Sequence, residues 1–288
     1  AAPLLLPGAA VSFCLAVGAP RGQTDPMLSY QHIYHAGNLA DLHKHALLAS
    51  MLDYLTRKDK PLSYLETHAG RGLYDLHTPE ALKTGEAAAG ILRAQQEGWL
   101  RPGHPLMRVL TRIHADHGPT AYPGSPLIAA HLLRPDDPMH LAELHPQEAS
   151  ALRDAMLRYP AHVHQQDGFE MAQSLCPPTP RRGLLLIDPS YEIKDDYIAL
   201  PRIIGTLHRK WNVGVIALWY PILTNGAQNA MVAALRKAHA DAMVHEVRFR
   251  PARPGHGMVG SGMVILNAPW GTDEAVGELD RFFAKLAR

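Results

Sequence analysis

Apolar residues alternate between two spacings along the chain, and these predict strands and helices in turn. Short apolar runs predict strands over residues 62–66, 139–144, 162–166, 183–187 and 213–218. Apolar positions at helical spacing predict helices over residues 46–55, 147–158 and 193–209. Such alternation is typical of a mostly parallel sheet with helices on both faces, so we expect an α/β fold.

The pattern departs from this alternation in two places. Residues 85–117 have a polar, helical pattern, and the stretch at about 75–120 therefore predicts a small inserted helical subdomain. Near the end of the chain, a helix over 227–240 precedes two strands, 243–249 and 262–266, with no full helix between them. This predicts a terminal β-hairpin.

The first 26 residues differ from the rest, being apolar, small and proline-containing. No basic residue precedes Leu4, and Pro7 and Gly8 interrupt the apolar run, so neither a secretory signal nor a membrane span is indicated. We expect the natural start at Met27, with residues 1–26 a non-native or disordered extension and residues 27–288 the folded domain.

Composition narrows the partners and the metal chemistry. Twenty-eight basic and 27 acidic residues give a net charge of +1, so a nucleic-acid partner needs a local basic patch. Cys14 and Cys176 lie far apart, which argues against a disulfide framework and fits a reducing cytoplasm. His43 and His45 lie two residues apart on a predicted helix and therefore on nearly opposite faces, so we expect no metal site.

Residues at the carboxyl ends of the predicted strands indicate an adenosine-bearing cofactor, because ligands of open α/β sheets bind there. Gly70 follows the first strand, where glycine lets the backbone approach a ligand. Glu143 follows the second strand and can accept ribose hydroxyls, and Asp167, before Gly168, can accept from an adenine amine. Alternatively, Gly70 belongs to a plain turn, Glu143 caps the next helix and Asp167-Gly168 is a turn pair. Their order, strand by strand, favours the cofactor.

The fourth strand end carries three candidate catalytic residues, Asp188, Pro189 and Tyr191. An exocyclic amine is a poor nucleophile because its lone pair is delocalised into the ring. The Asp188 carboxylate and the Pro189 carbonyl can hold its two hydrogens, so that the nitrogen becomes more tetrahedral and attacks a methyl group. Tyr191 offers a face for a flipped base. The alternative is a plain Asp-Pro β-turn, and the aromatic residues within 217–222 either line the base pocket or belong to the core.

From Met27 onward the chain resembles the RlmJ family of 23S ribosomal RNA adenine-N6 methyltransferases. The matching segments occur in the same order as in that family: Met27–His32, His35–Asp41, Lys44-His45, Thr67–Gly70, Tyr122–Ile128, Glu143–Pro146, Asp167–Phe169, Arg181–Gly183, Ala217–Pro221 and Gly260–Met263. The resemblance implies a Rossmann-like class I methyltransferase domain with a small helical insertion.

By motif position, the resemblance also implies the roles of individual residues. The residues expected to contact S-adenosylmethionine are His45, His68, Gly70, Ser125, Glu143, Asp167 and Gly168. Tyr30, His32 and Lys44 are expected to hold or orient the substrate adenosine, with Asp188 as the catalytic acceptor. Two positions depart from the family pattern. Ser190 replaces a second proline, so the Pro189 carbonyl is held less rigidly. Arg71 stands in the glycine loop where a small residue is expected, and it affects the approach of the backbone to the cofactor unless its side chain points outward.

The resemblance implies a cytoplasmic, monomeric enzyme that acts on 23S ribosomal RNA, without a metal and without a membrane. Two alternatives remain: an adenine-N6 methyltransferase acting on DNA, and a catalytically silent nucleic-acid-binding or DNA-uptake protein that kept the fold. The candidate phosphate contacts are Arg181, Arg182, Arg248, Arg250, Arg253 and His256.

Overall fold

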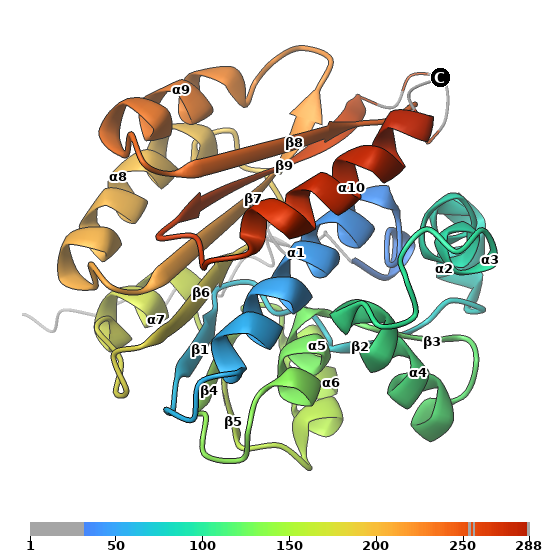
Figure 1. The fold of residues 1–288 in the computed structure, drawn as a ribbon, viewed down its shortest axis with the longest axis horizontal. Helices are drawn as coiled ribbons and strands as arrows, with labels where there is room; N and C mark the ends of the chain where they lie inside the picture. The colour runs from blue at the N-terminus through green and yellow to red at the C-terminus, as the bar shows by residue number, and fades with distance from the viewer. Residues whose placement is uncertain (1–31, 253–254, 256, 287–288) are drawn as a thin grey trace, which may run out of the picture.

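A seven-stranded sheet forms the centre of the molecule (Figure 1), as seen in a computed structural model that describes residues 32–252, 255 and 257–286. Its strand order is β5-β4-β1-β6-β7-β9-β8. The strands are β1 Ser63–Glu66, β4 Met139–Ala142, β5 Ala161–His164, β6 Gly183–Ile187, β7 Val215–Leu223, β8 Met243–Arg248 and β9 Met258–Leu266. All neighbours from β5 to β7 are parallel, whereas β9 is antiparallel to both β7 and β8. The predicted α/β, Rossmann-like fold with its terminal hairpin is confirmed. The predicted start at Met27, residues 1–26 and Tyr30 lie outside the described residues.

Helices cover both faces of this sheet (Figure 1). Along β6, Leu184 and Leu186 pack into the apolar cluster that contains α1, whereas Leu185 and Ile187 pack into the opposite cluster, under α8 and α9. A strand with both faces buried reads as a continuous apolar run, which is why β6 was predictable to the residue. The helices outside the segment at 75–120 are η2 His32–Tyr34, α1 Leu39–Thr56, α5 Ser125–Leu132, α6 Pro146–Met156, α7 Gly168–Leu175, α8 Asp196–Lys210, α9 Asn229–Ala238 and α10 Thr272–Leu286.

A second, two-stranded sheet brackets the segment that we interpret as an insertion. Its strands are β2 (Leu73–Asp75) and β3 (Ala121–Pro123), which pair antiparallel and were not predicted. Between them lie α2 Pro79–Thr84, η3 Ala88–Leu92, α3 Arg93–Gln96 and α4 Pro105–His117. The polar, helical pattern over 85–117 corresponds to η3, α3 and α4, and Gly98, with left-handed backbone angles, lies between α3 and α4.

The first helix, α1, is buried along most of its length. Its N-cap is Asn38, and the Asn38 side chain accepts from the Asp41 amide at 2.8 Å. The helix packs against α4, α5, α10 and β9. It therefore brings two charged side chains, Asp41 and Lys44, into the interior, where each needs a partner of opposite charge. Within the described residues, no helix combines the length and apolar character needed to cross a membrane.

Gly183 allows β1 and β6 to pair closely, and this generates a stability prediction. A Cβ at Gly183 would lie 2.1 Å from the Ser63 carbonyl oxygen, so the two backbones would have to separate. We expect Gly183→Ala to lower the free energy of unfolding by about 3 kcal/mol in urea denaturation. Gly103→Ala is the control, because a Cβ there meets nothing within 4 Å. Equal stability of the two variants would contradict this account of the β1–β6 pair.

Candidate active site

A cavity of about 510 Å³ lies outside the carboxyl ends of the strands, a volume within the usual range for small-molecule sites. All the predicted site residues that the structure describes line it: His32, Lys44, His45, His68, Gly70, Ser125, Glu143, Asp167, Gly168, Asp188, Pro189 and Tyr191. They come from η2 and α1, from the loop after β1, from α5 and from the ends of β4, β5 and β6. The fold therefore gathers these residues in one place, while their individual roles stay predictions.

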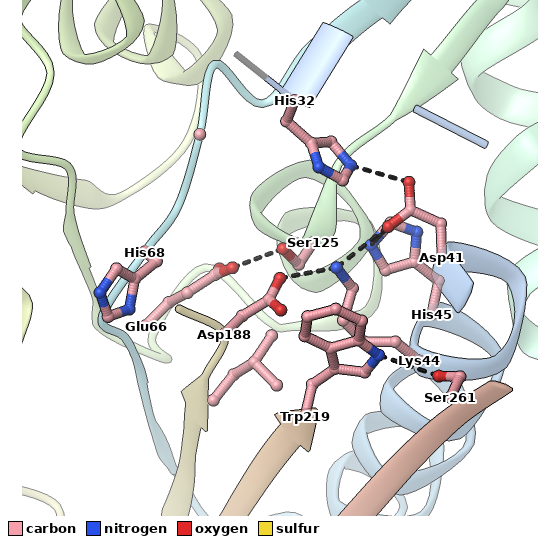
Figure 2. A network of polar contacts seen from close by, with 12 residues as sticks. His32, Asp41, Lys44, His45, Glu66, His68, Ser125, Asp188, Trp219 and Ser261 are labelled. Carbon is pink, nitrogen blue, oxygen red and sulfur yellow. Dashed lines mark hydrogen bonds and ion pairs between the residues drawn. The ribbon is translucent and has the colours of Figure 1, made fainter. Parts of the chain in front are cut away.

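An ion triad lies at the centre of the site (Figure 2). The Lys44 Nζ lies 2.6 Å from Asp188 Oδ2 and 3.0 Å from Asp41 Oδ1, and only 4% of the lysine side chain is exposed. Burial lowers the pKa of Lys44, but the carboxylates of Asp188 and Asp41 raise it more, so the pKa lies above its usual value. Lys44 therefore stays charged and ties the end of β6 to α1.

Asp41 is a buried part of this network that the sequence analysis did not select. It accepts from His32 Nε2 at 2.8 Å and from the Gly37 amide at 2.9 Å, besides pairing with Lys44. Burial raises the pKa of Asp41, but His32 and Lys44 lower it well below its usual value. The available signal was the pairing of Asp41 with Lys44 three residues later, in a helix that is otherwise mostly apolar.

Two histidines at the cavity are neutral at physiological pH. Burial lowers the pKa of His45 to about 3 and that of His68 to about 4. His45 Nδ1 shares a 2.8 Å hydrogen bond with the Tyr122 hydroxyl, and His68 Nδ1 shares one of 2.7 Å with Thr67 Oγ1. These imidazoles therefore act through hydrogen bonding and shape rather than through charge.

The turn after β1 is held by Glu143. The Gly70 amide donates to Glu143 Oε2 at 2.8 Å, and the His145 amide donates to Oε1 at 2.8 Å. His145, rather than Glu143, is the N-cap of α6, so the capping interpretation of Glu143 was wrong. The Arg71 side chain pairs with Glu148 at 2.6 Å and does not line the cavity among the described residues, whereas Gly70 does.

Asp167 and Gly168 begin α7, a helix that the sequence analysis missed, and so are not a turn pair. Asp167 Oδ1 accepts from the Phe169 and Glu170 amides at 2.8 and 2.9 Å, whereas no donor among the described residues reaches Oδ2. A Cβ at Gly168 would lie 1.9 Å from the Thr67 carbonyl oxygen. Glycine is therefore required where the helix start passes the loop after β1.

The segment from Asp188 to Tyr191 has a constrained backbone. Tyr191 has a φ of 58°, in the left-handed region that residues other than glycine seldom adopt. Its hydroxyl donates to the Trp219 carbonyl at 2.6 Å, and its ring stacks on Tyr197 with centroids 4.7 Å apart. The aromatic residues of β7 were expected either to line the base pocket or to belong to the core. Trp219 lines the cavity, whereas Tyr220 is buried and donates to Glu246.

The candidate phosphate contacts that the structure describes lie at opposite ends of the strands. Arg182 precedes β6 and donates to the Lys60 carbonyl at 2.9 Å, so Arg181 and Arg182 lie at the amino end of the strand, away from Asp188. Arg248 and Arg250 lie at the carboxyl end of β8, which runs in the direction of β7 and so ends at the cavity edge. Arg253 and His256 lie outside the described residues.

Within the described part of the chain, no group of three potential ligands could hold a metal ion.

Glu66, at the end of β1, was also missed by the sequence analysis. It is fully buried and accepts from the hydroxyls of Ser125 and, at 2.9 Å, Tyr64. Burial raises the pKa of Glu66 to about 8, although both hydroxyl contacts lower it. Ser125, predicted as a cofactor contact, therefore links the cavity wall to a carboxyl group that is protonated at neutral pH.

This raised pKa generates a pH prediction. Between about pH 4.5 and 8 the folded protein keeps a proton on Glu66 that the unfolded chain releases, so this residue's stabilisation is lost as pH rises. Relative to Glu66→Gln, wild-type protein should lose roughly 1.4 kcal/mol of unfolding free energy per pH unit, measured by urea denaturation at pH 5 to 8. The exposed Glu170→Gln is the control and should parallel wild type. A constant difference between wild type and Glu66→Gln would contradict the assignment.

Comparison with known proteins assigns the family. The sequence model of the family described as "Ribosomal RNA large subunit methyltransferase D, RlmJ" matches residues 59–287. Ribosomal RNA large subunit methyltransferase J of Escherichia coli (strain K12) is 39% identical over 247 residues, covering 85% of this chain and 88% of that protein. Its namesake from Haemophilus influenzae is 37% identical over 267 residues, covering 90% and 94%.

A solved structure agrees with these matches. The crystal structure of a protein from Legionella pneumophila superposes with a TM-score of 0.80 at 34% sequence identity, covering 88% of this chain and 94% of that one. The family match spans residues 59–287, which include every strand of the large sheet, and the two relatives cover 85% and 90% of the chain. The chain belongs to the RlmJ family of large-subunit ribosomal RNA methyltransferases.

Proposed function

We propose that the chain transfers a methyl group from S-adenosylmethionine to N6 of an adenine in 23S ribosomal RNA. The observation that carries this proposal is the position of Asp188: it follows β6, lines the cavity and is held by Lys44 at 2.6 Å. Lys44 bonds only Oδ2, and no donor among the described residues reaches Oδ1 or the neighbouring Pro189 carbonyl. Two acceptors thus lie side by side, as the two hydrogens of an exocyclic amine require.

The cavity fits the proposed cofactor. Its volume of about 510 Å³ is sufficient for a nucleoside carrying an amino-acid chain. Glu143 and Asp167 lie at the ends of β4 and β5, where carboxylates accept from ribose hydroxyls and from an adenine amine, and Gly70 and Gly168 leave backbone exposed to the ligand. Bound there, S-adenosylmethionine would supply an electrophilic methyl group on a sulfonium. The neutral imidazoles of His45 and His68 add no positive charge to repel it.

The residues around Asp188 activate the amine by placement. Hydrogen bonds from the amine to Asp188 and to the Pro189 carbonyl localise the nitrogen lone pair, which makes the nitrogen a better nucleophile. Lys44 fixes the carboxylate so that little rearrangement is needed during transfer. Ser190, in place of the family's second proline, leaves both acceptors present, so we expect its cost to fall on rate rather than on reaction type.

The substrate base enters from the side formed by aromatic residues. Tyr191 and Trp219 both line the cavity beside Asp188, with ring centroids 5.9 Å apart in an edge-to-face arrangement. A base flipped out of its helix can stack against such rings while its amine reaches the acceptors. We propose RNA rather than DNA as the substrate because the relatives from E. coli and H. influenzae are named for ribosomal RNA.

Replacement of Asp188 tests the proposed chemistry. Asp188→Ala removes one of the two amine acceptors, so we expect kcat to fall about a thousandfold while the Kd for S-adenosylmethionine stays within a few-fold. Activity is measured as N6-methyladenosine formed in 23S ribosomal RNA transcripts, by mass spectrometry of nuclease digests. Calorimetry gives the cofactor affinity.

The matched control is Asp195→Ala, an exposed carboxylate seven residues later that does not line the cavity. This variant should methylate like wild type. Turnover by Asp188→Ala at the rate of this control would refute the catalytic assignment. A parallel assay on RNA and DNA of one sequence tests the substrate: methylation of DNA alone identifies a DNA enzyme, and failure to bind the cofactor at all identifies a silent binding protein.

A further inference from the structure

The indole of Trp219 touches both halves of the proposed catalytic centre. The Lys44 Nζ lies over its ring, 5.4 Å from the centroid, on the side of the ion triad. Its backbone carbonyl accepts from the Tyr191 hydroxyl, and the two rings meet edge to face. The orientation of this one ring therefore affects both the cation that holds Asp188 and the aromatic wall beside it.

A chain of hydrogen bonds runs from that indole to the surface. The Trp219 Nε1 donates to Ser261 Oγ on β9 at 2.9 Å, and Ser261 Oγ bonds His43 Nδ1 on α1 at 2.8 Å. His43 Nε2 bonds His245 Nδ1 on β8 at 2.9 Å, and His245 Nε2 bonds Asp280 Oδ1 on α10 at 3.0 Å. His43 and Ser261 are fully buried, whereas 61% of the Asp280 side chain is exposed. Of these five hydrogen-bonded residues, only Trp219 lines the cavity.

The two ends of this chain set its direction. An indole N–H can only donate and an ionised carboxylate can only accept, so the bonds run from Trp219 toward Asp280. Burial, with His245 second, lowers the pKa of His43 well below its usual range, so His43 is neutral and carries one ring proton. In the tautomer of His245 that donates Nε2–H to Asp280 and accepts at Nδ1, His43 Nε2–H donates to His245 and Ser261 donates to His43 Nδ1. Each donor then meets one acceptor.

We propose that Ser261 and His43 are positioning residues for methyl transfer, which fix the plane of the Trp219 indole over Lys44 and thereby the position of the Asp188 carboxylate. This inference rests on the proposed function of the site, because the atoms to be positioned are those that hold the substrate amine. The arrangement suits that task, since rotating the indole breaks the bond of its N–H to the buried Ser261 hydroxyl and leaves that donor unpaired.

Ser261→Ala tests the proposal with a small change in a buried side chain. It removes the acceptor of the indole, whereas the matched control, Ser63→Ala, removes an equally buried hydroxyl that donates to the Pro180 carbonyl at 2.8 Å. Protein labelled with 5-fluorotryptophan gives one ¹⁹F resonance for each of the four tryptophans, and Trp219→Phe identifies that of Trp219. We expect Ser261→Ala to shift the Trp219 resonance and to lower kcat about tenfold, with KM for RNA nearly unchanged, and Ser63→Ala to do neither.

Asp280, at the exposed end of this series of hydrogen bonds, provides a second test with a smaller expected effect. Asp280→Ala removes the last acceptor and should shift the Trp219 resonance in the same direction but less, while Asp280→Asn keeps a carbonyl acceptor and should restore it. A Trp219 resonance unmoved in Ser261→Ala, or a kcat equal to that of Ser63→Ala, overturns the proposal. If the wild-type protein methylates nothing, the proposed function fails, and the fluorine spectra still report whether the chain orients the indole.

Discussion

The site depends on one buried ammonium group held between two carboxylates. Lys44 would be costly to bury alone, and it is stable in the interior because Asp41 and Asp188 face it at 3.0 and 2.6 Å. These partners come from the same helix and from the end of β6, 144 residues later in the sequence. Removing Lys44 leaves both carboxylates without the cation between them, so the triad joins the stability of this region to the placement of the proposed catalytic carboxylate.

The triad is charged, whereas burial keeps other ionisable groups around it neutral. It lowers the pKa of His45 to about 3 and that of His68 to about 4, and it raises the pKa of Glu66 to about 8. Near neutral pH the inner site therefore holds one lysine cation and the carboxylates that face it, beside uncharged hydrogen-bonding groups. Such an arrangement is compatible with the cationic methyl donor and the neutral amine that we propose, because neither meets an unpaired positive charge.

The sequence predicted the parts of this structure that local pattern determines. The strands of the parallel sheet and the residues at their ends follow from apolar runs, and β6 with Asp188 after it was predicted to the residue. Glu66 and Ser261 were missed because their importance comes from partners distant in sequence: Ser125 lies 59 positions from Glu66, and His43 lies 218 positions from Ser261. Asp41 was missed although its partner Lys44 follows only three residues later. The three-residue strand β2 and the eight-residue helix α7 were missed because so few residues show no clear periodicity.

The contribution of α1 explains why the site is built before either substrate enters. This helix precedes the first strand of the large sheet and packs against α4, α5, α10 and β9, so its own position is fixed by the core. From that position it supplies Lys44 to the end of β6 and His43 to the chain behind Trp219. The acceptors that we propose for the amine are therefore oriented by groups of the folded chain alone. In a transfer that creates little new charge on the protein, such preorganisation is what a rigid buried helix can provide and a surface loop cannot.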